Sequence, residues 1–303
     1  MSGSVQVEVE GRRLSLSNLD KVFYPATGFT KGEVIDYYTR VAPVVLPHLR
    51  GRALTLKRYP DGVEGPHFYE KECPRHRPEW MRTEAIALRS DDRKVNFCVV
   101  DELAALVWAA NLADLELHTS LSLATDPGRP TMLAFDLDPG PPAAILECAR
   151  VAVALRDTLA QLSLASFPKT SGSKGMQVYV PLDGRSTYEQ TKPFARGLAE
   201  HLERAHPDIV VSSMKKSLRA GKVLIDWSQN DEHKTTVCVY SLRARPRPTV
   251  STPVTWEEVA ATADAADPDL LVFQADHVVE RVRRLGDLFA PLNQLEQALP
   301  QLA

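Results

Sequence analysis

The chain has 303 residues, of which 44% are hydrophobic and 25% are charged, so it has the composition of an ordinary globular protein and enough length for a substantial core. The N-terminus lacks the apolar segment of a secretion signal and no apolar run is long enough to cross a bilayer, which argues against a secreted or membrane-spanning protein and predicts a cytoplasmic one. The formal net charge of −3 excludes a chain that is strongly basic overall.

Capping residues and apolar spacing predict a mixed α/β fold. Thr30 and Glu33 match a capping box at the start of a helix over residues 30–47. In chain order the remaining predicted elements are a strand at 53–59, a helix at 101–113, a strand at 133–138, a helix at 142–162, and strands at 176–182, 222–227 and 235–242. We expect the last two strands to form a hairpin across residues 229–233.

The four cysteines are widely spaced along the chain. Such spacing favours a reducing compartment and argues against a disulfide framework. Cys73 and His76 have the C-x-x-H spacing of half a zinc site, but no second pair follows at a matching distance. We therefore expect both residues to be structural.

The stretch LAFDLDPG, residues 133–140, places two carboxylates at the end of an apolar run. Side chains two residues apart in a strand point to the same face, so Asp136 and Asp138 stand side by side while Leu137 turns into the core. Adjacent like charges repel unless a cation lies between them, and hard divalent cations prefer carboxylate oxygens. The pair predicts a metal site, although a plain Asp-Pro-Gly turn would account for Asp138 alone.

A second motif, KTSGSKGMQVYVP at residues 169–181, runs from a Gly-rich loop directly into a strand. Gly172 and Gly175 let the backbone approach an anion, the serine hydroxyls can donate hydrogen bonds, and Lys174 adds a positive charge, which together suit a triphosphate. The loop is not a Walker A motif, because it does not open a helix. Two alternatives stay open at this point: a plain Gly-rich turn, and the S-x-x-K pattern of a serine acyl enzyme.

Asp226 lies inside the apolar strand VLIDW, where a buried carboxylate needs a partner. It could pair with an arginine in a purely structural role. Together with the DxD pair, the Gly-rich loop and the arginines of residues 243–247, it forms a coherent set for phosphoryl transfer. In that chemistry carboxylates hold two metal ions about 3.5–4 Å apart.

The net charge conceals an uneven distribution. Lys and Arg outnumber Asp and Glu by nine to five in residues 1–60 and by eight to three in residues 211–250, whereas residues 251–303 carry three basic and nine acidic residues. Basic blocks suit a phosphate backbone, although a solvated surface is their commoner explanation.

The motifs DLDPG, SGSKG, MKKSLRAGKVLIDWSQN and YSLRARPRPTVSTPVTW, in this order, resemble the polymerase domain of bacterial ligase D, a member of the archaeo-eukaryotic primase superfamily. Three further segments, SNLDKVFYPATGFTKGEVIDYY, LKRYPDGVEGPHFYEK and ELHTS, extend the resemblance from about Leu14 to Trp256. It implies a mixed α/β, primase-type fold of two β-sheets flanked by helices around a central active-site cleft. We expect one primase-polymerase catalytic domain over residues 1–303, with an acidic helical appendage from about residue 251.

The resemblance also implies roles for individual residues. The catalytic metal ligands would be Asp136, Asp138 and Asp226. The nucleotide would be bound by Ser171, Lys174, His118, Arg243 and Gln229, although His118 could instead be a core histidine. A 5′-phosphate on DNA would be held by Lys21, Lys31 and Asn18. Contacts to template bases and the DNA backbone would come from Phe68, Tyr69, Lys57, Arg58, Lys215, Lys216 and Arg219.

The sequence departs from the family pattern beside the Gly-rich loop. Where many members have a histidine, this chain has Gln177 after Met176, and on a strand these two side chains would point to opposite faces. If the family histidine tunes the site, the departure changes nucleotide preference or rate here, while the assignment of the three aspartates as metal ligands stands. The chain also has no K-x-D-G motif of a ligase nucleophile, so we expect a stand-alone polymerase or an excised domain.

The implied function is a template-directed nucleotidyltransferase that extends DNA 3′ ends or fills short 5′-phosphorylated gaps in non-homologous end joining. The implied cofactors are two divalent ions, Mn²⁺ in preference to Mg²⁺, and ribonucleotides are favoured over deoxynucleotides. The implied protein partners are Ku and a separate ATP-dependent DNA ligase. We expect the chain to be a monomer and to be located in the cytoplasm, at the nucleoid. Three alternatives are a silent DNA end-binding module, a primase that makes primers de novo, and a DxD glycosyltransferase, against which the Gly-rich loop and Asp226 argue.

Overall fold

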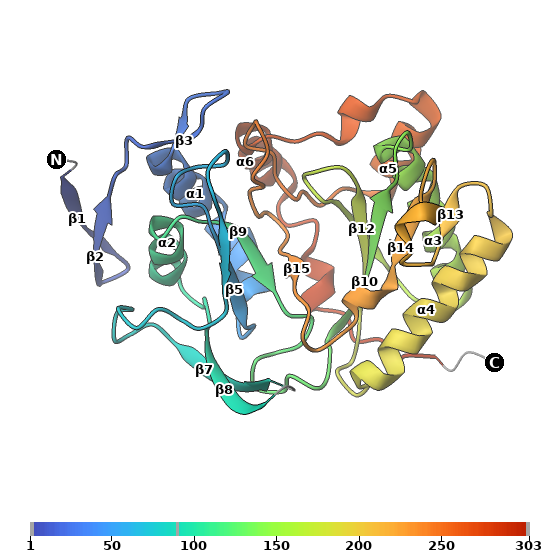
Figure 1. The fold of residues 1–303 in the computed structure, drawn as a ribbon, viewed down its shortest axis with the longest axis horizontal. Helices are drawn as coiled ribbons and strands as arrows, with labels where there is room; N and C mark the ends of the chain where they lie inside the picture. Colours follow the sequence, from blue (N-terminus) through green and yellow to red (C-terminus); the bar gives the residue numbers. More distant parts are fainter. Residues whose placement is uncertain (1–2, 89–90, 301–303) are drawn as a thin grey trace. The chain divides into compact units, whose positions relative to one another are not determined.

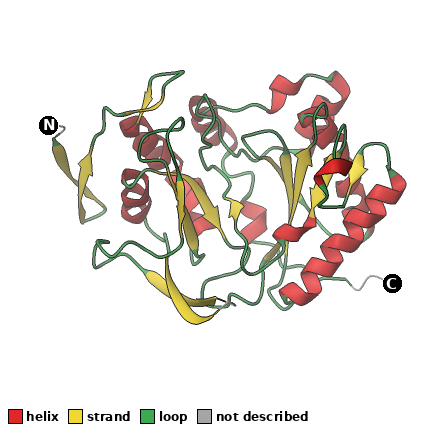
Figure 2. Cartoon of the chain, viewed as in Figure 1, coloured by secondary structure: helices red, strands yellow, loops and turns green. Residues whose placement is uncertain are grey.

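The computed structural model describes residues 3–88 and 91–300, and the chain divides into two compact units. Unit 1 comprises the chain up to Ser120 together with residues 237–250 and 274–287; unit 2 comprises residues 121–236, 251–273 and the chain from Leu288. Figure 1 follows the chain through these segments, and Figure 2 shows its helices and strands. Both units contain helices and strands. The mixed α/β class, with sheets flanked by helices, is confirmed.

Unit 1 contains a hairpin, a short two-stranded sheet and a six-stranded sheet. The hairpin pairs β1 (Ser4–Val9) with β2 (Arg12–Ser17), and the short sheet pairs β3 (Val22–Tyr24) with β4 (Phe29–Thr30). The larger sheet has the order β15-β9-β5-β8-β7, with β6 paired to β5. Its strands are β5 (Leu54–Arg58), β6 (Phe68–Glu70), β7 (Thr83–Leu88), β8 (Asp91–Cys98), β9 (Asp114–Thr119) and β15 (Thr236–Val237).

The helices of unit 1 are α1 (Lys31–Leu49), α2 (Leu103–Asn111) and α6 (Ala275–Leu285), and α1 packs against the other two. The start of α1 confirms the predicted capping box. The Thr30 hydroxyl accepts a hydrogen bond from the Glu33 amide at 3.2 Å, and the Glu33 carboxylate accepts one from the Thr30 amide at 2.7 Å. Among residues 3–88 and 91–300, no helix combines the length and the hydropathy needed to cross a bilayer.

Unit 2 is built on a five-stranded sheet with the order β11-β12-β10-β14-β13. Its strands are β10 (Met132–Pro139), β11 (Phe167–Thr170), β12 (Met176–Pro181), β13 (Val210–Val211) and β14 (Val223–Asp226). Its helices are α3 (Ile145–Gln161), α4 (Tyr188–Ala205) and α5 (Trp256–Ala265), with short 3₁₀ turns η1 (Lys216–Leu218), η2 (Trp227–Gln229), η3 (Pro268–Leu271) and η4 (Ala290–Asn293).

The two faces of the unit 2 sheet differ in chemistry because strand side chains alternate. Leu137, Met176 and Ile225 are fully buried in the core that the sheet forms with α3 and α4. The residues next to them in sequence, Asp136, Gln177 and Asp226, therefore lie on the opposite face. The predicted strand over residues 133–138, with Leu137 inward and both aspartates on the other face, is confirmed.

The predicted hairpin between residues 222–227 and 235–242 is wrong. β14 pairs with β10 and β13 in the unit 2 sheet, whereas β15 lies at the edge of the six-stranded sheet. The chain leaves β14 through the helical turn η2, where the Asp226 carboxylate accepts a hydrogen bond from the Ser228 amide at 2.9 Å. This cap starts a helical turn instead of the reversal that a hairpin requires.

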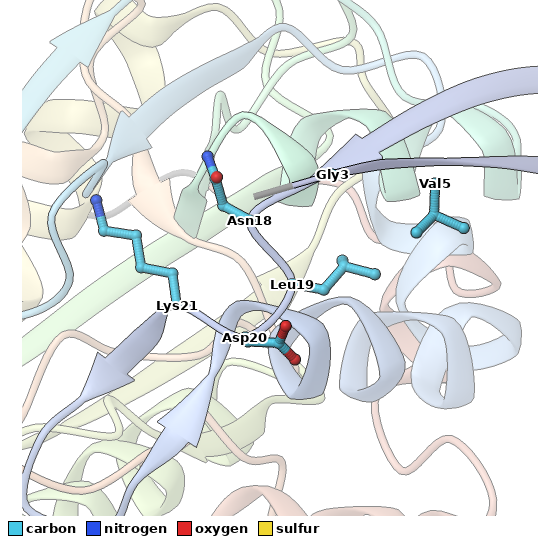
Figure 3. Close-up of a pocket in the computed structure, with 6 residues that line it drawn as sticks. All are labelled: Gly3, Val5, Asn18, Leu19, Asp20 and Lys21. Atoms are coloured by element: carbon cyan, nitrogen blue, oxygen red, sulfur yellow. The ribbon is translucent and has the colours of Figure 1, made fainter. Parts of the chain in front are cut away.

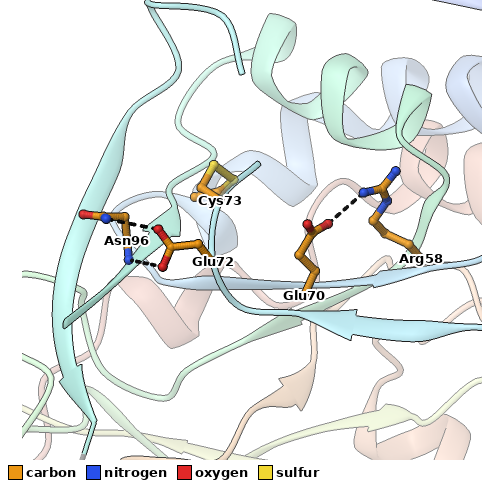
Figure 4. The surroundings of a disulfide bond; sticks show 6 residues. Arg58, Glu70, Glu72, Cys73 and Asn96 are labelled. Carbon is orange, nitrogen blue, oxygen red and sulfur yellow. Dashed lines mark hydrogen bonds and ion pairs between the residues drawn. A yellow bond between two sulfur atoms is a disulfide. The ribbon is translucent and has the colours of Figure 1, made fainter. Parts of the chain in front are cut away.

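The expectation that the cysteines form no disulfide is also wrong for one pair. Cys73 and Cys98 are bonded, with their Cα atoms 4.9 Å apart, while Cys148 and Cys238 are free and buried. The segment before Cys73 is fastened to β8 by hydrogen bonds, since the Asn96 amide and side chain donate to the Glu72 carboxylate at 3.2 and 3.1 Å (Figure 4). This docking brings together two cysteines that lie 25 residues apart in sequence.

Candidate functional site

A row of polar side chains crosses four strands of unit 2 on the face opposite its helices. In the strand register Lys169 of β11 lies opposite Gln177 of β12, Gln177 lies opposite Asp136 of β10, and Asp136 lies opposite Asp226 of β14. Directly opposite side chains in an antiparallel pair are neighbours about 4.5–5.5 Å apart at Cβ. The register therefore brings Asp136 and Asp226, separated by 90 positions in sequence, to one place.

The three predicted metal ligands share this face. Asp138 follows Asp136 along β10 and is exposed, whereas Asp226 is buried. Burial, together with the charges of Asp138 and Asp226, raises the pKa of Asp136 to about 7, and the hydrogen bond from Gln177 acts in the opposite direction. A divalent cation would relieve this repulsion, and an all-carboxylate donor set suits Mn²⁺ or Mg²⁺.

The three aspartate side chains do not form a complete set of metal ligands in this structure. Within residues 3–88 and 91–300, no three His, Cys, Asp or Glu side chains converge closely enough to hold an ion as they stand. Asp226 is occupied instead by its own loop: the Ser228 amide donates to it at 2.9 Å, and the Gln229 side chain donates at 2.9 Å. These donors replace the arginine considered as a structural partner, and they place the Gln229 side chain against Asp226.

The Gly-rich loop between β11 and β12 has the predicted non-helical form. The Ser171 hydroxyl accepts hydrogen bonds from the amides of Ser173 and Gly175, both at 3.2 Å, which closes the loop on itself. A Cβ at Gly175 would lie 2.0 Å from the Leu137 carbonyl oxygen, so only glycine allows the loop to lie this close to β10. The loop is thereby fixed next to the DxD strand, with Lys174 exposed.

The six-stranded sheet of unit 1 carries a second polar row. Tyr69 of β6 lies opposite Lys57 of β5, and Lys57 lies opposite Glu116 of β9. The Glu116 carboxylate is 2.9 Å from the Lys57 ammonium, 3.1 Å from His118 Nε2 and 3.4 Å from Arg243 Nε. The structure thus brings His118 and Arg243, both predicted to bind nucleotide, to one buried acid.

Glu116 is a residue that the sequence interpretation missed. The alternation in DLELHT places Glu116 and His118 on the same face of a strand, and this pattern could have identified it. Although burial alone would raise it, the pKa of Glu116 is held well below its usual range by the hydrogen bond from His118 and by the charges of Arg243 and Lys57. The pKa of His118 is lowered by burial and by the same two cations, despite its bond to Glu116.

Two exposed aromatic side chains border this cluster. Phe68 and Tyr69 are 44% and 57% exposed, which is unusual for large hydrophobic residues. The Arg58 guanidinium lies 5.2 Å from the Phe68 ring centroid, and the Lys57 ammonium lies 5.4 Å from that of Tyr69. Exposed rings with cations beside them suit stacking against single-stranded bases.

The predicted phosphate-binding residues gather at the start of unit 1. Asn18 and Lys21 line a pocket of about 650 Å³ together with Gly3, Val5, Leu19 and Asp20, as Figure 3 shows. The Lys31 amide donates to the Lys21 carbonyl at 2.8 Å, and the buried Lys31 ammonium donates to the Ser17 carbonyl at 2.6 Å. Burial, with Lys21 and Arg58 nearby, lowers the pKa of Lys31 to about 8.

The remaining basic residues predicted to contact DNA lie around η1 in unit 2. Lys215 and Lys216 are exposed, and the Arg219 guanidinium donates to the Met214 carbonyl at 2.7 Å. Each unit therefore assembles part of the predicted set: the carboxylates, the Gly-rich loop and the η1 cations in unit 2, and His118, Arg243, the aromatic pair and the phosphate pocket in unit 1.

Comparison with known proteins places the chain in a family. Residues 30–289 match the family model described as "LigD, primase-polymerase domain". The chain is 43% identical over 290 residues to the multifunctional non-homologous end joining DNA repair protein LigD of Mycobacterium tuberculosis, covering 93% of this chain and 37% of that protein. It is 30% identical over 275 residues to the bifunctional non-homologous end joining protein LigD of Bacillus subtilis, covering 90% of this chain and 43% of that protein.

A solved structure gives the same result. The polymerase domain of Mycobacterium tuberculosis ligase D in complex with DNA matches with a TM-score of 0.87 and 43% identity, covering 94% of this chain and 99% of that one. The chain spans less than half the length of the curated relatives named above. The matched length and identity show that this chain belongs to the family of LigD primase-polymerase domains.

Proposed function

We propose that the chain is a metal-dependent, template-directed nucleotidyltransferase that extends DNA 3′ ends and fills short gaps bearing a 5′-phosphate during non-homologous end joining. The observation that supports it most is the set of three aspartates on one sheet face, beside the glycine-dependent SGSKG loop. A protein that only bound DNA ends would have no use for three carboxylates that repel a phosphate backbone.

Asp136, Asp138 and Asp226 would hold two divalent cations, Mn²⁺ in preference to Mg²⁺. When bound, these ions would activate the 3′-hydroxyl and neutralise charge on the departing pyrophosphate. Lys174 and Ser171 of the SGSKG loop would bind the incoming triphosphate, with Gln229 beside the carboxylates. His118 and Arg243 would contribute further nucleotide contacts, and ribonucleotides would be preferred over deoxynucleotides.

The DNA would be recognised by three groups of residues. Lys21, Lys31 and Asn18 would bind the 5′-phosphate across a gap, while Phe68 and Tyr69 would stack on template bases. Lys57, Arg58, Lys215, Lys216 and Arg219 would contact the DNA backbone. Ku and a separate ATP-dependent ligase would act with this polymerase in end joining.

Gap filling by the purified chain tests this proposal. A one-nucleotide DNA gap is presented with either a 5′-phosphate or a 5′-hydroxyl, with Mn²⁺ or Mg²⁺, and with ribonucleotides or deoxynucleotides in separate reactions. We expect templated extension that is strongest with Mn²⁺, ribonucleotides and the 5′-phosphate, and that is lost in Asp138→Ala.

Two results would contradict the proposal, and a third would change the activity that it assigns. If neither protein extends the primer while both bind the 5′-phosphorylated gap tightly, the chain is an end-binding module. If Asp138→Ala extends as fast as the unaltered chain, the three aspartates are not the catalytic site. Synthesis on a template without any primer would assign the chain a primase activity instead.

A further inference from the structure

Tyr179, Gln177 and Asp136 form a hydrogen-bonded line on the polar face of the unit 2 sheet. The Gln177 side-chain amide donates through Nε2 to Asp136 Oδ1 at 3.1 Å, and the Tyr179 hydroxyl donates to Gln177 Oε1 at 3.2 Å. Gln177 and Tyr179 are 4% and 3% exposed, so water does not compete freely for these polar groups. The line leads from the core to one of the three aspartates.

The Tyr179 ring is itself held in place from two sides. The Lys169 ammonium, which donates to the Ser251 hydroxyl at 2.6 Å, lies 5.4 Å from the ring centroid. Phe289 meets the ring edge-on with centroids 5.6 Å apart. With the ring fixed, its hydroxyl stays directed at the Gln177 carbonyl oxygen.

The contact with Tyr179 supports the end of the Gln177 amide that faces the carboxylate. A glutamine side chain can present either its oxygen or its NH₂ group, and the two choices have opposite effects on an anion. An ionised carboxylate only accepts hydrogen bonds, so Asp136 takes the NH₂ group, and the Tyr179 hydroxyl satisfies the oxygen that is left and holds the amide in this orientation. The donor is neutral, so it orients the carboxylate without adding a positive charge that would compete with a cation.

We propose that Gln177, oriented by Tyr179, is a positioning residue that holds Asp136 in the conformation that binds the divalent cation. The inference rests on the proposed metal role of Asp136. Groups that hydrogen-bond a metal ligand commonly set the affinity of the site, and their loss weakens metal binding by roughly 10- to 100-fold. Tyr179 acts only through Gln177.

The test measures Mn²⁺ binding to the DNA-free protein, by electron paramagnetic resonance of the unbound ion, so that the readout is independent of polymerase activity. We expect Gln177→Met, which keeps the side-chain length but removes the amide, to weaken Mn²⁺ binding by roughly 10- to 100-fold. Tyr179→Phe should weaken it less, and should have no further effect when added to Gln177→Met. Activity lost in these variants should return at high Mn²⁺ concentration.

Tyr188→Phe is the matched control, because its buried hydroxyl also bonds a neighbour in unit 2, Ser122, but lies outside the line. It should bind Mn²⁺ normally. If Gln177→Met does not fold, as judged by circular dichroism, Tyr179→Phe carries the test alone. Unchanged Mn²⁺ affinity in the folded variants, or additive effects in the double variant, would overturn the inference.

Asp136→Asn separates this outcome from failure of the proposed function. If Asp136→Asn abolishes Mn²⁺ binding while Gln177→Met leaves it intact, the aspartates bind metal and only the positioning inference is wrong. If Asp136→Asn binds Mn²⁺ with the same affinity as the unaltered chain does, Asp136 is not a metal ligand. The positioning inference is then wrong too, because it rests on that role.

Discussion

At the residue scale, Glu116 is the buried carboxylate on which three cationic or protonatable side chains of unit 1 converge. Lys57, His118 and Arg243 all lie within 3.4 Å of it. A single acid that orients several bases fixes their geometry and offsets part of their charge. The placement of two proposed nucleotide contacts therefore depends on one residue that itself is too buried to touch a substrate.

Glu116→Gln tests this dependence. The amide keeps the size of the side chain but removes the charge that holds Arg243 and Lys57, so we expect the KM for the nucleotide to rise roughly tenfold, since charged hydrogen bonds contribute about 1.5–3 kcal/mol. The turnover number should change less. Steady-state gap filling at varied nucleotide concentration measures both, with Glu79→Gln, an exposed glutamate of unit 1, as the control. An unchanged KM would show that Glu116 has no such role.

Lys31 provides a pH-dependent prediction. Its pKa of about 8 in the folded protein means that the ammonium loses its proton as the pH rises above 8. We expect the extra affinity that a 5′-phosphate gives to gapped DNA to decline between pH 8 and 9.5. Fluorescence anisotropy with phosphorylated and unphosphorylated gaps measures that difference. A phosphate-dependent increment that stays constant to pH 9.5 would remove Lys31 from the phosphate site.

The same shift has the opposite consequence for folding. Because the folded pKa lies below that of the unfolded chain, the unfolded state binds more protons between about pH 8 and 10.5. The contribution of Lys31 to stability therefore rises with pH across that window, while phosphate binding weakens. Because stability rises with pH while phosphate binding falls, weaker phosphate binding above pH 8 can be told apart from alkaline unfolding of the protein.

At the element scale, the strands that carry the aspartates follow directly from residue patterns, but their pairing does not. The alternation in residues 133–138 predicts which side of β10 faces the core, and the glycines of SGSKG predict a loop in place of a helix. The predicted hairpin between residues 222–227 and 235–242 is wrong because β14 pairs with β10, almost 90 residues earlier in the chain. No local turn signal in the sequence encodes so distant a contact. The Cys73–Cys98 disulfide was missed for the same reason.

Gly175→Ala tests the contact between the Gly-rich loop and β10. The added methyl group would lie 2.0 Å from the Leu137 carbonyl oxygen, so the loop must shift away. We expect a loss of about 1–3 kcal/mol of stability from overpacking, together with weaker nucleotide binding. Gly128→Ala, where a Cβ meets nothing within 4 Å, is the control, and chemical denaturation compares the two. Equal stability of both variants would contradict the account of the loop.

At the scale of the whole molecule, the chain runs through the two units in turn and contributes residues 237–250 and 274–287 to unit 1 after completing most of unit 2. Neither unit is therefore a continuous piece of sequence. The basic excess is likewise divided, with residues 1–60 in unit 1 and the η1 cations in unit 2. A net charge of −3 describes neither region.

The divided charge predicts how DNA binding depends on salt. If Lys215 and Lys216 each contact a phosphate, replacing both with alanine should reduce the slope of log affinity against log salt by about two. The loss should be similar for DNA of any sequence, because phosphate contacts carry no base information. Titrations between about 50 and 200 mM salt measure the slope. An unchanged slope would mean that Lys215 and Lys216 are solvated surface residues that contact no phosphate.

Asp226 tests most directly whether the three strand-borne aspartates form one catalytic metal site, because strand pairing brings it to the DxD pair. The measurement is the single-turnover rate of gap filling with Mn²⁺ by Asp226→Asn, which keeps the size and the polarity of the side chain. Asp157→Asn, an exposed aspartate on α3, serves as the control. We predict a loss of at least roughly 100-fold for Asp226→Asn and none for Asp157→Asn. Equal rates for the two variants would contradict the account.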